Sequence, residues 1–239
     1  MSVLAIETAT PRLGVALVDG ERPLASYELL GANPHAVELP AAVTHVLQAA
    51  RTTLECVEAI VVDIGPGSFT GLRIGLAFAK ALAIRYKTPL VGISSLDVLA
   101  CQLPWVSQQI CPLLDAKQKN VYAALYRAQG ASAVRQTQHL LGPVDDVLAL
   151  IREPTLFLGD GCALYRDRIV GRLGEHARFA APDLWLPSVA TLGRLGSERF
   201  AKGERDDPKT LVPLYLYPLD CSVRGPDRPT AVLPKPVRA

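Results

Sequence analysis

A glycine-rich stretch, Gly65 to Gly75, constrains the chain most, because it joins two segments of different character. Before it, Ala59 to Val62 is a continuous apolar run, which is typical of a buried strand. After it, Leu72 to Ile84 is apolar and predicts a helix, with Ser68 or Thr70 as its N-cap. The sequence therefore predicts a strand, a tight turn and a helix, which is the local unit of an α/β fold.

The turn itself allows two interpretations. Its backbone N–H groups would converge on one point, an arrangement that suits a phosphate. The stretch nevertheless lacks the Lys-Ser or Lys-Thr pair that closes a Walker loop, and its glycine spacing differs from the dinucleotide-binding fingerprint. A tight turn that only begins a helix is the alternative.

Two stripes run along the predicted helix. The first consists of small residues at every fourth position, Gly71, Gly75, Ala79 and Ala83. The second is bulkier and consists of Ile74, Phe78 and Leu82. Because small residues allow another helix to approach closely, the first stripe indicates either packing inside the domain or an interface with a partner.

The first half of the chain predicts a mixed sheet with helices over its faces. Strands are expected at 3–6, 14–20, 24–29, 57–62 and 89–93, and helices at 33–51, 72–84 and 94–101. Asn33 and Pro34 would begin the first helix, whose apolar face would consist of Val37, Ala41 and either Val46 or Leu47. Pro40 would either kink this helix or lie in its first turn.

The second half repeats this plan in weaker form after a break near Leu103-Pro104-Trp105. Strands are expected at 110–114, 121–127 and 155–158, and helices at 144–152, 162–170 and 188–202. We therefore expect a first lobe over 1–104 and a second over 105–221, with the last helix, 188–203, packing back on the first. The proline-rich and basic tail, 222–239, is expected to be poorly ordered.

Composition excludes several classes of protein. The net charge of +2 gives no general argument for binding nucleic acid or membranes. No apolar run reaches membrane-spanning length, and no signal peptide is recognisable at the N-terminus. Five scattered cysteines without a CxxC pair favour small buried side chains in a reducing compartment, so we expect a cytoplasmic protein without a structural zinc site.

Three acidic residues lie at predicted strand ends: Glu7, Asp63 and Asp160. Glu7 and Asp160, one in each lobe, would be placed to hold Mg²⁺ beside a phosphate. The simpler alternative is that all three face water in turns. His35 and His45 are ten residues apart and lack metal-ligand spacing, and neither Ser94 nor Ser95 has the context of a hydrolase nucleophile. The residues alone predict no catalytic set.

The chain resembles the bacterial tRNA threonylcarbamoyladenosine biosynthesis protein TsaB (YeaZ) family. Gly65 to Gly75, GPGSFTGLRIG, looks like the signature of that family, and Leu4 to Thr10 looks like its opening LAIDTST. Shorter matches follow at 35–40, 89–96, 115–117 and 159–161. The resemblance is strong over about the first hundred residues and thinner beyond them.

The resemblance implies a two-lobed actin/Hsp70/sugar-kinase fold built on ribonuclease-H-like sheets. It also implies a non-catalytic subunit needed for threonylcarbamoyl transfer to adenosine 37 of tRNAs that read codons starting with A. The catalytic subunit would be the TsaD paralogue, which carries an HxxxH metal pair on the helix that here reads Ser94 to Ala100. The ATPase TsaE would join the complex, and tRNA would be bound indirectly.

The resemblance further implies which residues bind the partner. The helices at 35–51 and 72–84 would pack on TsaD, or on a second copy of this chain, as a four-helix bundle. The expected interface residues are His35, Leu39, Val43, Leu47, Gly71, Ile74, Gly75, Phe78, Ala79 and Leu82. Replacing Gly75 with leucine is then expected to abolish pairing and leave the fold largely intact.

A nucleotide site is the remaining expectation. Its residues would be Glu7, Thr8, Thr10, Asp160 and Gly161, with ATP or ADP and Mg²⁺ bound only in the complex. Glu7 stands where the family usually has Asp, which weakens the case for a site in this chain alone. The alternative function is a stand-alone ATPase or kinase-like enzyme of the same fold.

Overall fold

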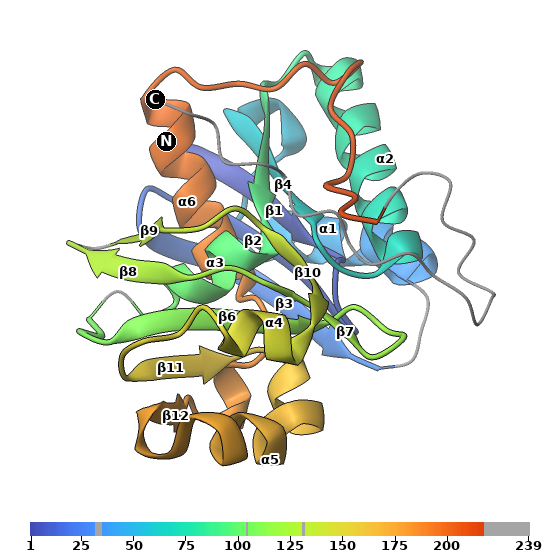
Figure 1. Ribbon diagram of the computed structural model, residues 1–239. Helices are drawn as coiled ribbons and strands as arrows, with labels where there is room; N and C mark the ends of the chain where they lie inside the picture. The colour runs from blue at the N-terminus through green and yellow to red at the C-terminus, as the bar shows by residue number, and fades with distance from the viewer. Residues whose placement is uncertain (32–34, 104, 131, 218–239) are drawn as a thin grey trace.

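The computed structural model describes residues 1–31, 35–103, 105–130 and 132–217, which form two α/β lobes (Figure 1). The first sheet has the strand order β3-β2-β1-β4-β5. Its strands are β1 (Ser2–Glu7), β2 (Arg12–Asp19), β3 (Arg22–Leu30), β4 (Ala59–Gly65) and β5 (Leu90–Ser94). The first three strands are antiparallel neighbours, and β4 and β5 run parallel to β1. The mixed sheet predicted from the sequence is thus confirmed.

Helices cover both faces of the first sheet. On one face α1 (His35–Ala49) and α2 (Phe69–Tyr86) contact each other and enclose a core with Leu4, Ile6 and Val62. On the other face lie α3 (Ser95–Cys101) and α6 (Val189–Ala201), which pack on Ala5, Val61 and Val91. In Figure 1, α2 and α6 accordingly lie on opposite sides of the sheet. The central strands are apolar on both sides because both sides are covered.

The second sheet has the order β10-β7-β6-β11-β12, which repeats the arrangement of the first. Its strands are β6 (Gln109–Asp115), β7 (Asn120–Ala123), β10 (Leu140–Pro143), β11 (Thr155–Leu158) and β12 (Ala177–Phe179). A hairpin of β8 (Tyr126–Gln129) and β9 (Ser132–Arg135) pairs with β6. One face is covered by α4 (Val144–Leu148) and α5 (Gly161–Leu173), and the other packs on α3 of the first lobe.

The chain returns to the first lobe after the second sheet. Short 3₁₀ turns at Leu54–Cys56, Gly174–His176 and Pro182–Leu184 connect elements, and the last of them precedes α6. Helix α6 then crosses β1 and β2, and Ser188 caps it by accepting a hydrogen bond from the Thr191 N–H. Beyond α6, the Leu214 N–H donates to the Ile64 carbonyl at 2.7 Å, and the Tyr217 hydroxyl donates to the Ala116 carbonyl at 3.0 Å. The end of the described chain therefore contacts both lobes.

Several predicted details were wrong. The single strand expected at 121–127 is broken into β7 and β8, which pair with different parts of β6, and β9 and β10 were not predicted. In α1 the buried face is Leu39, Ala42, Val43, Val46 and Leu47, whereas Val37 and Ala41 face outward. Pro40 lies inside α1.

Three predictions fall on residues outside the described ranges: the helix start at Asn33 and Pro34, the break at Pro104, and the tail 222–239. Within the described ranges no helix is both long and apolar enough to cross a membrane. Of the cysteines in those ranges, Cys101, Cys111 and Cys162 are buried as expected, and Cys56 is exposed.

Candidate functional site

A cleft of about 940 Å³ lies between the lobes. Two loops of the first lobe line it: the turn between β1 and β2, and the glycine-rich loop before α2. The second lobe lines the cleft with the hairpin between β6 and β7, which includes Asp115, Lys117 and Tyr122, and with Asp160 before α5. The last described residues, Leu214 to Tyr217, also line it. It is the large concave site at the junction of the lobes and hence the candidate ligand site.

The glycine-rich loop is fixed to the β1–β2 turn. The Ser68 N–H donates to the Ala9 carbonyl at 2.7 Å, and Ser68 Oγ accepts a hydrogen bond from the Gly71 N–H at 3.2 Å. The latter contact confirms Ser68 as the predicted N-cap of α2. The Gly65–Pro66 peptide bond in this loop is cis.

Six of the ten predicted interface residues are buried inside this chain: Leu39, Val43, Leu47, Gly71, Gly75 and Ala79. The small-residue stripe faces inward because α2 lies directly on the end of β1. A Cβ atom added to Gly75 would stand 2.1 Å from Thr8 Oγ1, and one on Gly71 would stand 2.0 Å from the Thr8 carbonyl oxygen. The small residues therefore permit packing within the first lobe, and Gly75→Leu is now expected to disturb the fold rather than leave it largely intact.

The other four predicted interface residues, His35, Ile74, Phe78 and Leu82, are half-buried. Fully exposed positions on α2 include Ala77, Ala81 and Ile84, which the sequence analysis did not select. Their role in binding a partner stays a prediction. The exposure of Ala77, Ala81 and Ile84 could have been predicted from the helical period, since these residues lie opposite the buried small-residue stripe of α2.

Glu7 does not face the cleft, so the predicted role of its carboxylate in holding Mg²⁺ was wrong. Its side chain is 0 % exposed, and Oε1 accepts hydrogen bonds from the Ala9 N–H at 2.8 Å and the Thr10 N–H at 3.2 Å. Burial, and then the neighbouring Asp63, raise the pKa of Glu7 well above its usual value. Two amide groups that would be available to a phosphate are thus taken by the chain itself.

Asp63 was expected to face water, with Mg²⁺ binding as the other possibility, and its side chain is instead buried. It is 0 % exposed, and Oδ1 accepts hydrogen bonds of 2.7 Å from the Gly65 N–H and from the Ser95 hydroxyl. Burial raises the pKa of Asp63, against the hydrogen bonds it makes. Its burial could have been predicted from its place in the strand, because β4 is covered on both faces.

The other predicted nucleotide-site residues are spread between the cleft and the core. Thr10 and Asp160 line the cleft, whereas Thr8 is buried and donates through Oγ1 to the Gly71 carbonyl at 2.9 Å. Gly161 is buried at the start of α5. Asp160 Oδ1 accepts from the Asp115 N–H at 2.9 Å, and burial raises the pKa of Asp160. In this chain alone these residues therefore do not all line the cleft, and binding of nucleotide and Mg²⁺ in the complex stays a prediction.

An aromatic wall that the sequence analysis missed lines the cleft. The Arg73 guanidinium lies 3.8 Å from the centre of the Phe69 ring, and its Nε donates to the Tyr215 hydroxyl at 3.0 Å. Tyr122 and Tyr217 meet edge to face on the other side. The Arg73 guanidinium is thus stacked on an aromatic ring while the side chain stays exposed. Sequence alone could not reveal this, because Phe69 and Tyr215 are far apart in the chain.

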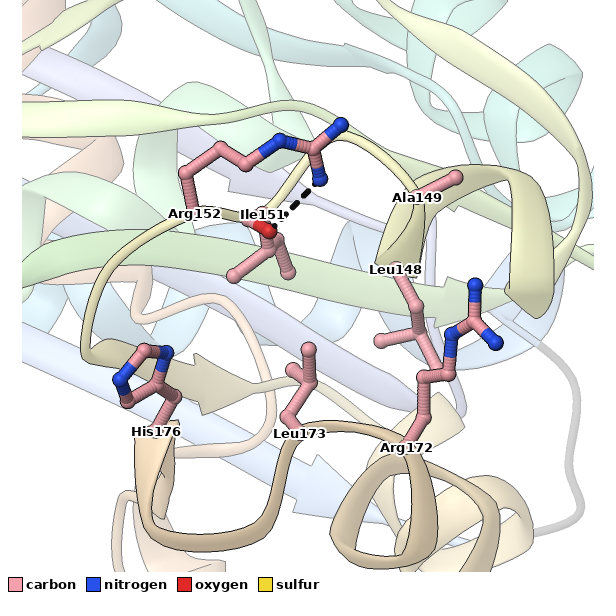
Figure 2. A pocket seen from close by; sticks show the side chains of 7 residues that line it. All are labelled: Leu148, Ala149, Ile151, Arg152, Arg172, Leu173 and His176. Carbon is pink, nitrogen blue, oxygen red and sulfur yellow. Dashed lines mark hydrogen bonds between the residues drawn. The ribbon is translucent and has the colours of Figure 1, made fainter.

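A second, shallower hollow of about 470 Å³ lies on the second lobe (Figure 2). Leu148, Ile151 and Leu173 form its apolar surface, and Arg152, Arg172 and His176 surround it. Arg152 Nη1 donates to the Ile151 carbonyl at 3.0 Å. No residue that the sequence selected for a site lines this hollow. Throughout the described part of the chain, no group of three or more His, Cys, Asp or Glu side chains is placed to hold a metal ion.

Comparison with known proteins identifies the family. Residues 30–216 match the family model "TsaD: tRNA N6-adenosine threonylcarbamoyltransferase". The chain is 32% identical over 219 residues to the tRNA threonylcarbamoyladenosine biosynthesis protein TsaB of Bacillus subtilis, covering 90% of this chain and 94% of the relative. The chain belongs to the TsaB family.

Two further relatives agree with the predicted family and fold. The TsaB protein of Escherichia coli is 28% identical, with 90% of this chain and 94% of that protein covered. A crystal structure from Pseudomonas aeruginosa, described as similar to peptidase YEAZ, superposes with a TM-score of 0.79 at 26% identity, covering 90% of this chain and 99% of that one. The predicted TsaB (YeaZ) resemblance is confirmed, and so is the predicted two-lobed α/β fold with mixed sheets.

Proposed function

We propose that this chain takes part in making threonylcarbamoyladenosine in tRNA, as a docking subunit that binds the catalytic TsaD paralogue. Its TsaB-named relatives and the matched family model support the process. An outward apolar surface on the first lobe supports the docking role. We define this docking surface as Val37 and Ala41 of α1 with Ile74, Ala77, Phe78 and Ala81 of α2.

The observation that carries the proposal is the exposure of this surface. Val37 is 68% exposed, and Ala41, Ala77 and Ala81 are also exposed, although all four are apolar. The two helices contact each other on the same face of the sheet. Exposed apolar side chains on adjacent helices are typical of an interface, and two such helices can pair with two helices of a partner.

Helix α3 supports a role other than catalysis for this chain. The resemblance to the wider family places the metal pair of the catalytic paralogue on this helix. Here Ser95, Leu96, Val98 and Leu99 are all buried between the two lobes, and Ser95 Oγ donates to Asp63. These side chains maintain the contact between the lobes. In the complex, TsaE and tRNA would then be bound mainly through the catalytic partner.

An aspartate substitution in the docking surface tests the proposal. Ala81→Asp should weaken binding to TsaD by roughly 30-fold or more, since a charge buried within an interface costs about 2 kcal/mol or more. Binding would be measured by titration calorimetry and by light scattering after gel filtration. Ala163→Asp, at an exposed alanine of α5 in the second lobe, is the matched control and should bind normally.

The result also has a clear contrary outcome. If Ala81→Asp keeps the thermal stability of the parent and still forms the heterodimer with unchanged affinity, α2 is not part of the interface. The same assay on the chain alone tests whether the docking surface also forms a homodimer, which the variant should then lose.

The alternative of a stand-alone ATPase predicts that the isolated chain binds Mg²⁺ and ATP in the cleft. Because Glu7 is buried and bonded to the Ala9 and Thr10 amides, we expect calorimetry with ATP and Mg²⁺ to give no binding heat. Micromolar binding by the isolated chain would favour the enzyme instead. Binding of ATP or ADP that arises only when TsaD is added stays a prediction.

A further inference from the structure

Two acidic side chains, Glu7 and Asp63, meet in the interior of the first lobe. In the parallel pair of β1 and β4, Ile6 lies beside Val62, so the next residues, Glu7 and Asp63, are neighbours on the same side of the sheet. Both are 0 % exposed. A Cβ atom on Gly14 would contact both Glu7 and Val189 of α6, which places α6 over the pair.

Each carboxyl uses one oxygen to hold a loop. Glu7 Oε1 accepts from the Ala9 and Thr10 N–H groups of the β1–β2 turn. Asp63 Oδ1 accepts from the Gly65 N–H of the glycine-rich loop and from Ser95 of α3. The two loops are the ones that line the cleft on the first lobe and that are joined by the Ser68 to Ala9 hydrogen bond.

The second oxygen of each carboxyl is buried and has no donor. Glu7 Oε2 and Asp63 Oδ2 find no hydrogen-bond partner within the described ranges. Two buried carboxylates in contact repel each other strongly, and a buried charge without a partner is costly. A single proton between the two free oxygens removes one charge and gives both atoms a partner.

Other charged groups near the pair do not replace that proton. Asp97 of α3 acts on Asp63 with the same sign of charge. His139 contacts Ser94, at 3.3 Å, and Arg135, and His35 contacts the Thr10 carbonyl, at 2.9 Å; neither histidine is bonded to Glu7 or Asp63. The groups that act on the two carboxyls include no lysine or arginine.

We propose that Glu7 and Asp63 share one proton and form an acid clamp, which fastens the β1–β2 turn to the glycine-rich loop at the cleft. The clamp leaves the amides of Ala9 and Thr10 occupied while the proton is present. Loss of the proton places two like charges side by side and loosens both loops. The clamp belongs to this chain and does not depend on the partner proposed above.

The sign of the pH effect follows from the raised pKa of Glu7 in the folded state. The folded chain keeps a proton that the unfolded chain releases near about pH 4.3, so stability falls as pH rises above that value and through the folded pKa. The stabilisation is complete only below the unfolded pKa. Above the folded pKa, both states have lost the proton and the slope disappears.

Glu7→Gln tests the clamp in the full chain. The glutamine Oε1 can still accept from Ala9 and Thr10, and its amide can donate to Asp63 Oδ2, so the hydrogen bonds remain and the titration is removed. From about pH 6 to about pH 9, the melting temperature of the parent should fall more steeply than that of the variant. Glu21→Gln, at an exposed glutamate, is the matched control and should follow the parent.

Infrared spectroscopy gives an independent readout of the proton itself. The parent at neutral pH should show the carbonyl band of a buried protonated carboxylic acid, and the band should vanish in Glu7→Gln and in Asp63→Asn. Parallel melting profiles for parent and Glu7→Gln, or a parent without that band, would overturn the proposal. If both variants fail to fold, the pH titration of the band in the parent decides.

A bound cation in place of the proton is a distinct outcome. It would give a melting temperature that rises with added Mg²⁺ or Ca²⁺ and falls with a chelator, and no carboxylic acid band. We expect the melting temperature of the parent to be unchanged by either addition. A dependence on the cation would replace the acid clamp with a metal site.

Discussion

The two lobes place acidic residues at equivalent strand ends and stabilise them in different ways. Strand order makes β1 and β4 of the first sheet equivalent to β6 and β11 of the second. In the first lobe Glu7 and Asp63 are both buried. In the second, Asp115 pairs with Lys117 at 2.6 Å, and Asp160 accepts from the Asp115 N–H.

The difference follows from what covers each strand end. The first pair is closed in by the start of α3, through Ser95, and by Val189 of α6. The second faces the cleft, where Lys117 remains 80% exposed and needs no desolvation. The same strand order therefore gives a pair that shares a proton where the strand ends are buried, and an ion pair where they are exposed to solvent.

The largest expected effect on stability distinguishes α2 of the first lobe from α5 of the second. Gly75→Leu should destabilise the chain by about 3 kcal/mol, because its side chain would overlap Thr8. Gly171→Leu in α5 is the matched control, since nothing lies within 4 Å of its Cβ position. It should be neutral or stabilising by up to about 1 kcal/mol, as leucine favours a helix over glycine.

Urea unfolding followed by circular dichroism measures both variants. Equal stability of Gly75→Leu and the parent would mean that α2 does not rest on the end of β1. The control also separates a local clash from a general intolerance of larger residues in the helices.

A smaller effect is expected at the second acidic pair. Asp115→Asn keeps an acceptor for the Lys117 N–H and loses the ion pair, so stability should fall by less than about 1 kcal/mol. Asp115 raises the pKa of Lys117, and this stabilisation is therefore present below the usual lysine pKa, about 10.4, and is lost only as pH rises through the raised value.

The melting profile of Asp115→Asn should consequently run parallel to that of the parent between about pH 6 and about pH 9. A flattened profile would assign the pH dependence to the second lobe, in conflict with the acid clamp. Together with Glu7→Gln, this variant decides which strand end titrates.

Local patterns were sufficient to predict much of the fold. The apolar run of β4, the Ser68 cap and the period of α2 each depend on neighbouring residues, and the structure has all three. The break between β7 and β8 was missed because it arises from pairing with different parts of β6. Such pairing depends on residues distant in sequence and leaves no local signal.

Site residues were harder to predict for the same reason. A stripe of glycine and alanine shows that something packs closely on α2, but not whether it is β1 of the same chain or a partner. Likewise Glu7 at a strand end suggests a ligand until its neighbour Asp63 is placed beside it. The aromatic wall required Tyr215 to return to Phe69 from the far end of the described chain.

The return of α6 to the first lobe has a consequence for the order of synthesis. Val189, Leu192 and Leu195 complete the core on one face of the first sheet, beside Val3 and Val18. At roughly 5–20 residues per second, the ribosome needs on the order of ten seconds or more to reach α6 after finishing β2. Until then β1 and β2 lack the cover that α6 gives on that face, although α3 is already made, and the first lobe completes its folding after the second has been made.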